Sequence, residues 1–206
     1  MIKVRRFAPF YFSLIFFLIL LLLGCDEQPE WETSDVTGQF PDLQFELTAE
    51  TGKTVTEEDF SGKVNLLFFG FTSCPDVCPN TLGRLSQVLR ELSPSQRGNV
   101  RILFVSVDPQ RDNPSRLAEY TDAFGEQFVG MTADQSTLRE LTGRYYTTFS
   151  YGESDREGNY TVQHNGSVFV FDRDDRARLK ITASGVGGIP SDSVNAIVAD
   201  IRRLIE

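Results

Sequence analysis

The sequence predicts an α/β fold, a three-layer sandwich in which a central mixed sheet is covered by helices on both faces. Residues 64–71 and 101–107 form nearly continuous apolar runs, which are typical of strands buried on both faces. Between these runs, from Pro79 onward, apolar residues recur at the spacing of one helix face. These residues are Leu82, Leu85, Val88, Leu89 and Leu92. Strand and helix therefore alternate along the chain.

The remaining elements follow in order. Residues 40–47 alternate loosely in polarity and lead through Thr51-Gly52-Lys53 into a predicted hairpin that ends near Phe60. Proline suits the first turn of a helix, so the helix after the first buried strand is expected to begin at Pro79. Further helices are expected over residues 114–124, 135–145 and 191–205, and a strand pair over residues 167–172 and 178–182.

Residues 1–24 are typical of a secretion signal: basic residues precede an apolar run over residues 7–23. The run ends in Leu22-Leu23-Gly24-Cys25, which resembles the lipobox of bacterial lipoproteins, so we expect Cys25 to be lipidated and to become the mature N-terminus. The alternative is an uncleaved signal anchor, although about 17 apolar residues is near the shortest length that spans a bilayer. In both cases the protein is expected on the extracytoplasmic face of a bacterial inner membrane.

Residues 25–39 are polar and acidic and predict a tether, which leaves residues 40–206 as one folded domain. Its length of about 165 residues suffices for a full hydrophobic core. Without residues 1–24 the chain has 17 Lys and Arg against 29 Asp and Glu, a net charge of −12. An acidic surface disfavours nucleic acid and anionic lipid as partners.

The segment Cys74-Pro-Asp-Val-Cys78 lies between the first buried strand and its helix. Thiols near a helix N-terminus have a lowered pKa and favour the thiolate, the form that ligates metal or attacks disulfides. With Cys25 assigned to the anchor, these are the two remaining cysteines, and outside the cytoplasm such a pair is ordinarily a structural disulfide. The spacing permits all three roles. The position of the pair favours a thioredoxin-like fold, which the order of elements alone does not distinguish from other three-layer sandwiches.

His164 is the single histidine of the chain, and a lone histidine is more often an ordinary surface or core residue than a ligand. Together with two thiolates, however, an imidazole makes a donor set suited to copper, as three-coordinate Cu(I) or as Cu(II) with an added oxygen ligand. Structural zinc usually takes four protein ligands, and neither a third soluble cysteine nor a second histidine is present. Met131 is the one internal methionine, which excludes a methionine-rich copper site.

Three segments resemble the signatures of the Sco/SenC family. Residues 62–79 resemble its cysteine motif, and residues 107–114 (Val-Asp-Pro-Gln-Arg-Asp-Asn-Pro) resemble its strand-end motif. Residues 160–164 (Tyr-Thr-Val-Gln-His) fall where the family has its histidine ligand. The resemblance extends over about residues 36–206.

The resemblance implies a thioredoxin-like fold that binds one copper through Cys74, Cys78 and His164. Members of the family act in maturation of the dinuclear copper centre of cytochrome c oxidase, as metallochaperones, as thiol–disulfide reductants of its cysteines, or both. The implied partners are the copper-centre subunit of the oxidase and an upstream copper donor. In the reductant role Cys74 and Cys78 are the catalytic redox pair and form a reversible disulfide. Dithiol exchange does not need His164, so this residue discriminates between the two roles.

The chain departs from the family at two positions. Gln163 stands where the family commonly has Asp, and Asn113 where it commonly has Thr. Without a carboxylate at position 163, Cu(II) binding or partner docking is expected to differ from the family. Asp108 and Asp112 follow a strand, at the sheet edge where sites gather in α/β folds, and either orient the site or a partner, or cap a turn. The histidine is expected in the loop before the strand over residues 167–172.

Overall fold

The structure is a computed structural model that describes residues 30–155, 160–164, 166–182 and 192–206. The folded unit extends from Trp31 to Glu206. The expected signal over residues 1–24 and the expected lipidation site Cys25 lie outside the described residues. Within the described ranges, every helix is too short or too polar to span a bilayer.

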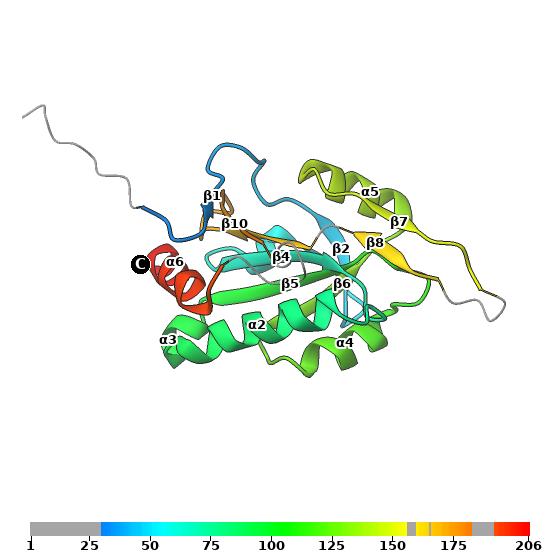
Figure 1. The fold of residues 1–206 in the computed structure, drawn as a ribbon, viewed down its shortest axis with the longest axis horizontal. Coiled ribbons are helices and arrows are strands. Elements are labelled where there is room, and N and C mark those ends of the chain that lie inside the picture. The colour runs from blue at the N-terminus through cyan, green and yellow to red at the C-terminus, as the bar shows by residue number, and fades with distance from the viewer. Residues whose placement is uncertain (1–29, 156–159, 165, 183–191) are drawn as a thin grey trace, which may run out of the picture. The chain divides into compact units, whose positions relative to one another are not determined.

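In the described part of the chain, the central sheet has eight strands in the order β1-β10-β9-β4-β5-β6-β2-β3 (Figure 1). They are β1 (Ser34–Asp35), β2 (Glu46–Ala49), β3 (Thr54–Thr56), β4 (Val64–Gly70), β5 (Val100–Ser106), β6 (Phe128–Thr132), β9 (Ser167–Phe171) and β10 (Ala177–Thr182). The neighbours β4, β5 and β6 are parallel, and the other pairs are antiparallel. The predicted mixed sheet is confirmed.

Helices cover both faces of this sheet. They are η1 (Glu57–Phe60), α2 (Val77–Glu91), α3 (Pro94–Arg97), α4 (Pro114–Asp122), α5 (Gln135–Arg144) and α6 (Val194–Ile205). Helices α2 and α4 lie on one side of the sheet and α5 lies on the other (Figure 1). A separate hairpin of β7 (Phe149–Tyr151) and β8 (Val162–His164) connects α5 to β9.

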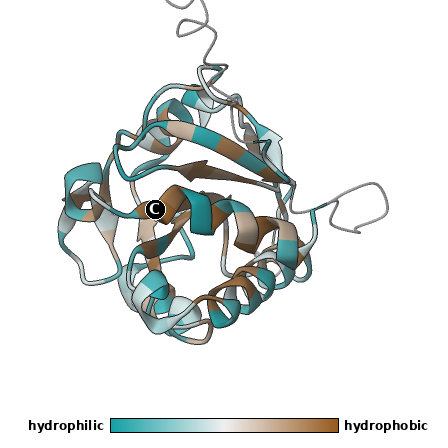
Figure 2. Cartoon of the chain, turned by 90° about the vertical axis from the view of Figure 1, so that its left-hand side faces the viewer, coloured by the Kyte–Doolittle hydropathy of each residue, from teal (hydrophilic) through white to brown (hydrophobic). Residues whose placement is uncertain are grey.

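The central strand β4 explains why the fold needs helices on both sides, because all seven of its residues are buried. Alternate side chains of a strand point to opposite faces. On one face Phe68 packs against Phe104, which contacts Tyr120 of α4. On the other face Phe69 packs against Tyr145, the residue after α5. Inner strands of the sheet are accordingly brown in Figure 2, whereas the uppermost strand in that view and the helices mix brown with teal.

The start of the folded domain corrects the sequence-based boundary. We expected a tether up to residue 39, but β1 pairs with β10, and Thr33 and Val36 are buried. The buried carboxylate of Asp200 in α6 accepts hydrogen bonds from the backbone N–H groups of Glu32 and Thr33 and from the Thr33 hydroxyl. The polar composition of this segment hid its role, because few of its side chains are apolar and its strand pairing and its bonds to Asp200 involve distant parts of the chain.

Candidate metal centre

The cysteine loop connects β4 to α2, as the sequence predicts. Both cysteines are free thiols in the structure, and the helix begins at Val77, two residues earlier than expected. Cys78 therefore lies in the first turn of α2, where it is buried, and Cys74 is half-buried. The Cys74 sulfur accepts a hydrogen bond from the backbone N–H of Cys78 at 3.4 Å. One of the unpaired N–H groups of the helix start is thus directed at a sulfur.

His164 reaches the same place from a different part of the chain. It lies on β8, opposite Phe149 in the hairpin, and not in a loop as expected. Its Nε2 is 3.4 Å from the Cys78 sulfur, and the ring meets those of Phe71 and Phe68 edge to face. The ligand atoms of Cys74, Cys78 and His164 all lie within 4.8 Å of one another.

These separations fit one metal ion. Zinc, as a reference, binds thiolate at about 2.3 Å and imidazole at about 2.0 Å, so two ligands on opposite sides of an ion are about 4.6 Å apart at most. Three ligands spread evenly around one ion would be about 4 Å apart at these bond lengths, so ligand atoms within 4.8 Å of one another need shifts of less than about 1 Å to bind a common ion. Two sulfurs and one imidazole nitrogen are donors for a soft or borderline metal.

The hydrogen bond between the two thiols shifts their pKa values in opposite directions. The pKa of Cys74 lies well below its ordinary value, chiefly because the Cys78 thiol donates a hydrogen bond to its sulfur. The pKa of Cys78 is raised, first by the same hydrogen bond and then by burial. These opposite shifts favour the thiolate at Cys74 and the protonated thiol at Cys78. Ligation by both sulfurs releases the proton of Cys78.

Asp112 fastens the cysteine loop to the end of β5. Its buried carboxylate accepts hydrogen bonds from the backbone N–H of Thr72 at 2.8 Å, from the Thr72 hydroxyl at 2.6 Å and from the Ser106 hydroxyl at 2.5 Å. The Arg116 side chain donates to the same Thr72 hydroxyl. Of the two alternatives left open by the sequence, orientation of the site is the role the structure gives to Asp112.

Asn113 serves the helix that follows. It is the N-cap of α4, and its side-chain oxygen accepts a hydrogen bond from the backbone N–H of Arg116 at 3.0 Å. Asparagine and threonine are both favoured at this position, so the departure from the family pattern is structurally neutral here. Gln163, the other departure, is exposed on β8 and borders a hollow of about 310 Å³ beside His164.

A tight contact under the cysteine loop leads to a stability prediction. A Cβ at Gly70, the last residue of β4, would lie 2.7 Å from the Phe104 ring and 2.9 Å from the Cys78 sulfur. Overpacking of this kind typically costs about 1–3 kcal/mol, and we expect Gly70→Ala to lower the free energy of unfolding by that amount. Urea unfolding measures it.

The matched control is Gly83→Ala. Gly83 lies inside α2, and a Cβ there meets no atom within 4 Å. Because alanine favours a helix over glycine by up to about 1 kcal/mol, this variant is expected to be as stable as the parent or more stable. Equal destabilisation by both substitutions would contradict a specific clash at Cys78.

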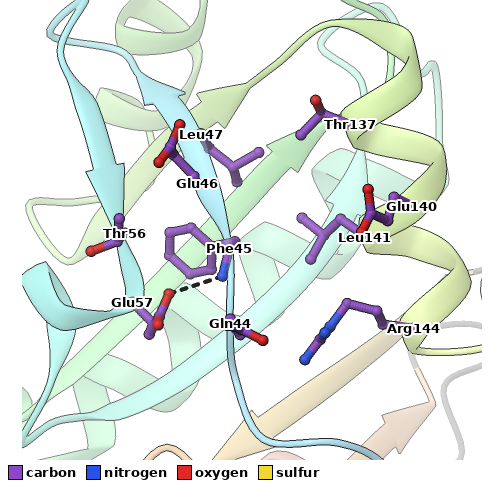
Figure 3. A pocket seen from close by; sticks show the side chains of 10 residues that line it. All are labelled: Gln44, Phe45, Glu46, Leu47, Thr56, Glu57, Thr137, Glu140, Leu141 and Arg144. Carbon is purple, nitrogen blue, oxygen red and sulfur yellow. Dashed lines mark hydrogen bonds between the residues drawn. The ribbon is translucent and has the colours of Figure 1, made fainter.

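A hollow elsewhere in the fold has no part in this cluster. It has a volume of about 540 Å³ and lies between the β2–β3 hairpin and α5, with side chains from both (Figure 3). Its polar lining combines Glu46, Glu57 and Glu140 with Arg144, and Glu57 accepts a hydrogen bond from the backbone N–H of Phe45. It contains no cysteine or histidine.

The chain matches one family of known proteins. The family model described as SCO1/SenC matches residues 36–206. The mitochondrial SCO1 homolog of Homo sapiens is 34% identical over 131 residues, which are 63% of this chain and 44% of the human protein. An SCO2-like protein of Rickettsia conorii is 29% identical over 130 residues, 62% of either chain. The matches thus span less than two thirds of these relatives' length.

Solved structures agree with the fold. Bradyrhizobium japonicum ScoI with copper bound has a TM-score of 0.69 and 31% identity, covering 79% of this chain and 98% of that one. Apo Sco1 from Thermus thermophilus has a TM-score of 0.73 and 30% identity, covering 86% and 99%. The predicted thioredoxin-like fold is therefore confirmed, and the chain belongs to the SCO1/SenC family.

Proposed function

We propose that this protein binds one copper ion through Cys74, Cys78 and His164 and serves as a metallochaperone for the dinuclear copper centre of cytochrome c oxidase. The observation that carries the proposal is the convergence of the three ligand atoms within 4.8 Å. The copper in the Bradyrhizobium japonicum structure supports the choice of metal. The role in oxidase assembly is supported by the family resemblance.

The three ligands of the site contribute differently to binding the copper ion. Two thiolates favour Cu(I), and the imidazole completes a three-donor set that also accommodates Cu(II). Because Cys78 is protonated before loading, its proton is exchanged for the metal. Cys74 is half-exposed, so it is the ligand that an incoming donor or acceptor protein reaches first.

We further propose that a lipid on Cys25 holds the protein on the extracytoplasmic face of the bacterial inner membrane. An uncleaved signal anchor is the alternative. Copper would come from an upstream donor protein and pass to the copper-centre subunit of the oxidase. The lipobox-like ending at Cys25 and the acidic charge balance support this arrangement.

A thiol–disulfide oxidoreductase acting on the cysteines of the same centre is the second candidate. Two free thiols, one held as a thiolate by its neighbour, favour it. In that role Cys74 attacks the target disulfide, Cys78 then displaces the target thiol, and the Cys74–Cys78 disulfide forms as the target is reduced. His164 would then be dispensable.

An anaerobic Cu(I) titration against a competing chelator tests the proposal. The full chain carrying Cys25→Ser has Cys74 and Cys78 as its only thiols. We expect one tightly held copper per chain, and loss of tight binding in the His164→Ala variant, because one of three ligands is gone. Full affinity in that variant would overturn the three-ligand site. Absence of competitive binding, with a readily exchanged disulfide, would favour the oxidoreductase.

A further inference from the structure

We propose that Tyr160 is a positioning residue, which holds His164 within reach of the two thiols through Asp108 and Arg111. It does not bind the metal itself. The inference extends the proposed copper site and rests on it.

The hairpin that carries His164 needs such support. Strands β7 and β8 pair with each other and form a two-stranded sheet apart from the central one. An isolated two-stranded hairpin is marginally stable in water. Only three residues of each strand are paired, so backbone hydrogen bonds contribute little to holding the imidazole in place. Side-chain contacts to the rest of the fold must fix its position.

Tyr160, four residues before His164, makes several of these contacts. Its hydroxyl donates a hydrogen bond of 2.5 Å to the carboxylate of Asp108, a residue with no exposed surface. The Arg111 guanidinium lies over the Tyr160 ring at 3.8 Å, donates to the Tyr160 carbonyl at 3.0 Å and forms an ion pair with Asp108. Hydrogen bonds to an ionised group are the stronger kind, and burial shields them from water.

A second tyrosine fastens the opposite strand of the hairpin. Tyr151 of β7 donates its hydroxyl to the carbonyl of Val107 at 2.7 Å, and its ring meets that of Tyr160 edge to face. Val107 directly precedes Asp108. Both strands of the hairpin are therefore attached to the loop after β5.

The same loop also holds the cysteines. Asp112, four residues after Asp108, binds Thr72 of the cysteine loop, and the Arg111 guanidinium lies 5.8 Å from the Phe71 ring. Residues 107–112 thus connect the two segments that supply the ligands, which are otherwise 86 positions apart in sequence. The geometry assigns two roles to this loop: Asp108 positions the segment that carries the histidine, and Asp112 positions the segment that carries the cysteines.

The test compares Cu(I) affinities of full-length Cys25→Ser chains with and without Tyr160→Phe. Phenylalanine keeps the ring under Arg111 and removes only the hydroxyl. Removal of a group hydrogen-bonded to a metal ligand typically weakens metal binding by 10–100-fold, and because Tyr160 acts through the hairpin backbone we expect the lower end, about 10-fold. In the His164→Ala background, measured with a weaker chelator, the same substitution is expected to have no effect, because there is no imidazole left to position.

Two further measurements accompany the titration. The Cu(II) charge-transfer spectrum of Tyr160→Phe is expected to shift towards that of His164→Ala. In the metal-free protein, amide exchange at residues 162–164 is expected to be faster in Tyr160→Phe. Tyr146→Phe, at a tyrosine that is 78% exposed, is the control and should change none of the three readouts.

Equal weakening by Tyr160→Phe with and without His164 would overturn the proposal, since the effect would then be general destabilisation. Unchanged affinity in the His164-containing chain would also overturn it. If the parent chain binds no copper, the proposed function fails, and amide exchange of the metal-free protein decides the positioning role: faster exchange at residues 162–164 supports it, and unchanged exchange rejects it.

Discussion

Cys78→Ser is expected to abolish tight Cu(I) binding while leaving the fold intact. The Cys78 sulfur lies 3.4 Å from His164 Nε2, and its thiol donates a hydrogen bond to the Cys74 sulfur, so it interacts with both other ligands. Serine has nearly the same shape, but its hydroxyl is a hard donor that keeps its proton at neutral pH and offers little to Cu(I). The change therefore removes a ligand with the least disturbance of packing.

Chelator competition under anaerobic conditions measures the loss, and circular dichroism with urea unfolding checks the fold. Thr81→Ser is the matched control, because Thr81 is buried on α2 one turn after Cys78 and its hydroxyl bonds only to the Val77 carbonyl among the described contacts. It should bind copper like the parent. Parental affinity in Cys78→Ser would mean that the copper is held elsewhere.

Oxidation of the dithiol is expected to eliminate Cu(I) binding and to do so reversibly. The two sulfurs are not bonded to each other in the structure, and the Cys74 sulfur, in the loop before α2, accepts a hydrogen bond from the backbone N–H of Cys78 in the first turn of that helix. A disulfide forms when both thiols lose their protons and two electrons pass to an oxidant, and its sulfurs no longer act as thiolate ligands. Copper affinity is then controlled by the redox state of Cys74 and Cys78.

Cu(I) titrations at three stages measure this effect: on the reduced chain, after oxidation with a diazene oxidant, and after re-reduction with a dithiol. Binding should disappear and return. In the Cys25→Ser chain, Cys74→Ser leaves Cys78 as the single thiol and cannot form the intramolecular bond, so a free-thiol count of this variant separates disulfide formation from other oxidation. Equal Cu(I) affinity of the oxidised and reduced parent chains would contradict the switch.

Strong local patterns made most of the sheet and helices predictable. The continuous apolar runs became β4 and β5, since a strand covered on both faces needs apolar side chains at every position. The helices over 114–122 and 135–144 begin where Asn113 and Asp134 cap them, close to the predicted starts.

Weak local patterns hid other elements. The strand β6 has only five residues, and Gly130 is one of them. A Cβ at Gly130 would clash with Leu117 of α4, so close packing requires glycine here and the strand lacks a β-forming side chain at this position. The short hairpin β7–β8 and the two-residue strand β1 are set by partners elsewhere in the chain. Such elements owe their existence to tertiary contacts, and their own sequences carry little periodicity.

The sequence by itself determined which side chains are available for the site: two cysteines at a strand–helix junction and one histidine. It also placed both thiols at a helix start, but the lowered pKa of Cys74 and the raised pKa of Cys78 depend chiefly on the hydrogen bond between the two side chains. Only the tertiary structure decided that His164 lies on a strand 3.4 Å from Cys78, and that Asp108, Arg111 and Tyr160 hold it there. The physical reason is distance along the chain: local periodicity reports on neighbours a few residues apart, whereas contacts across 86 positions depend on how the whole sheet packs.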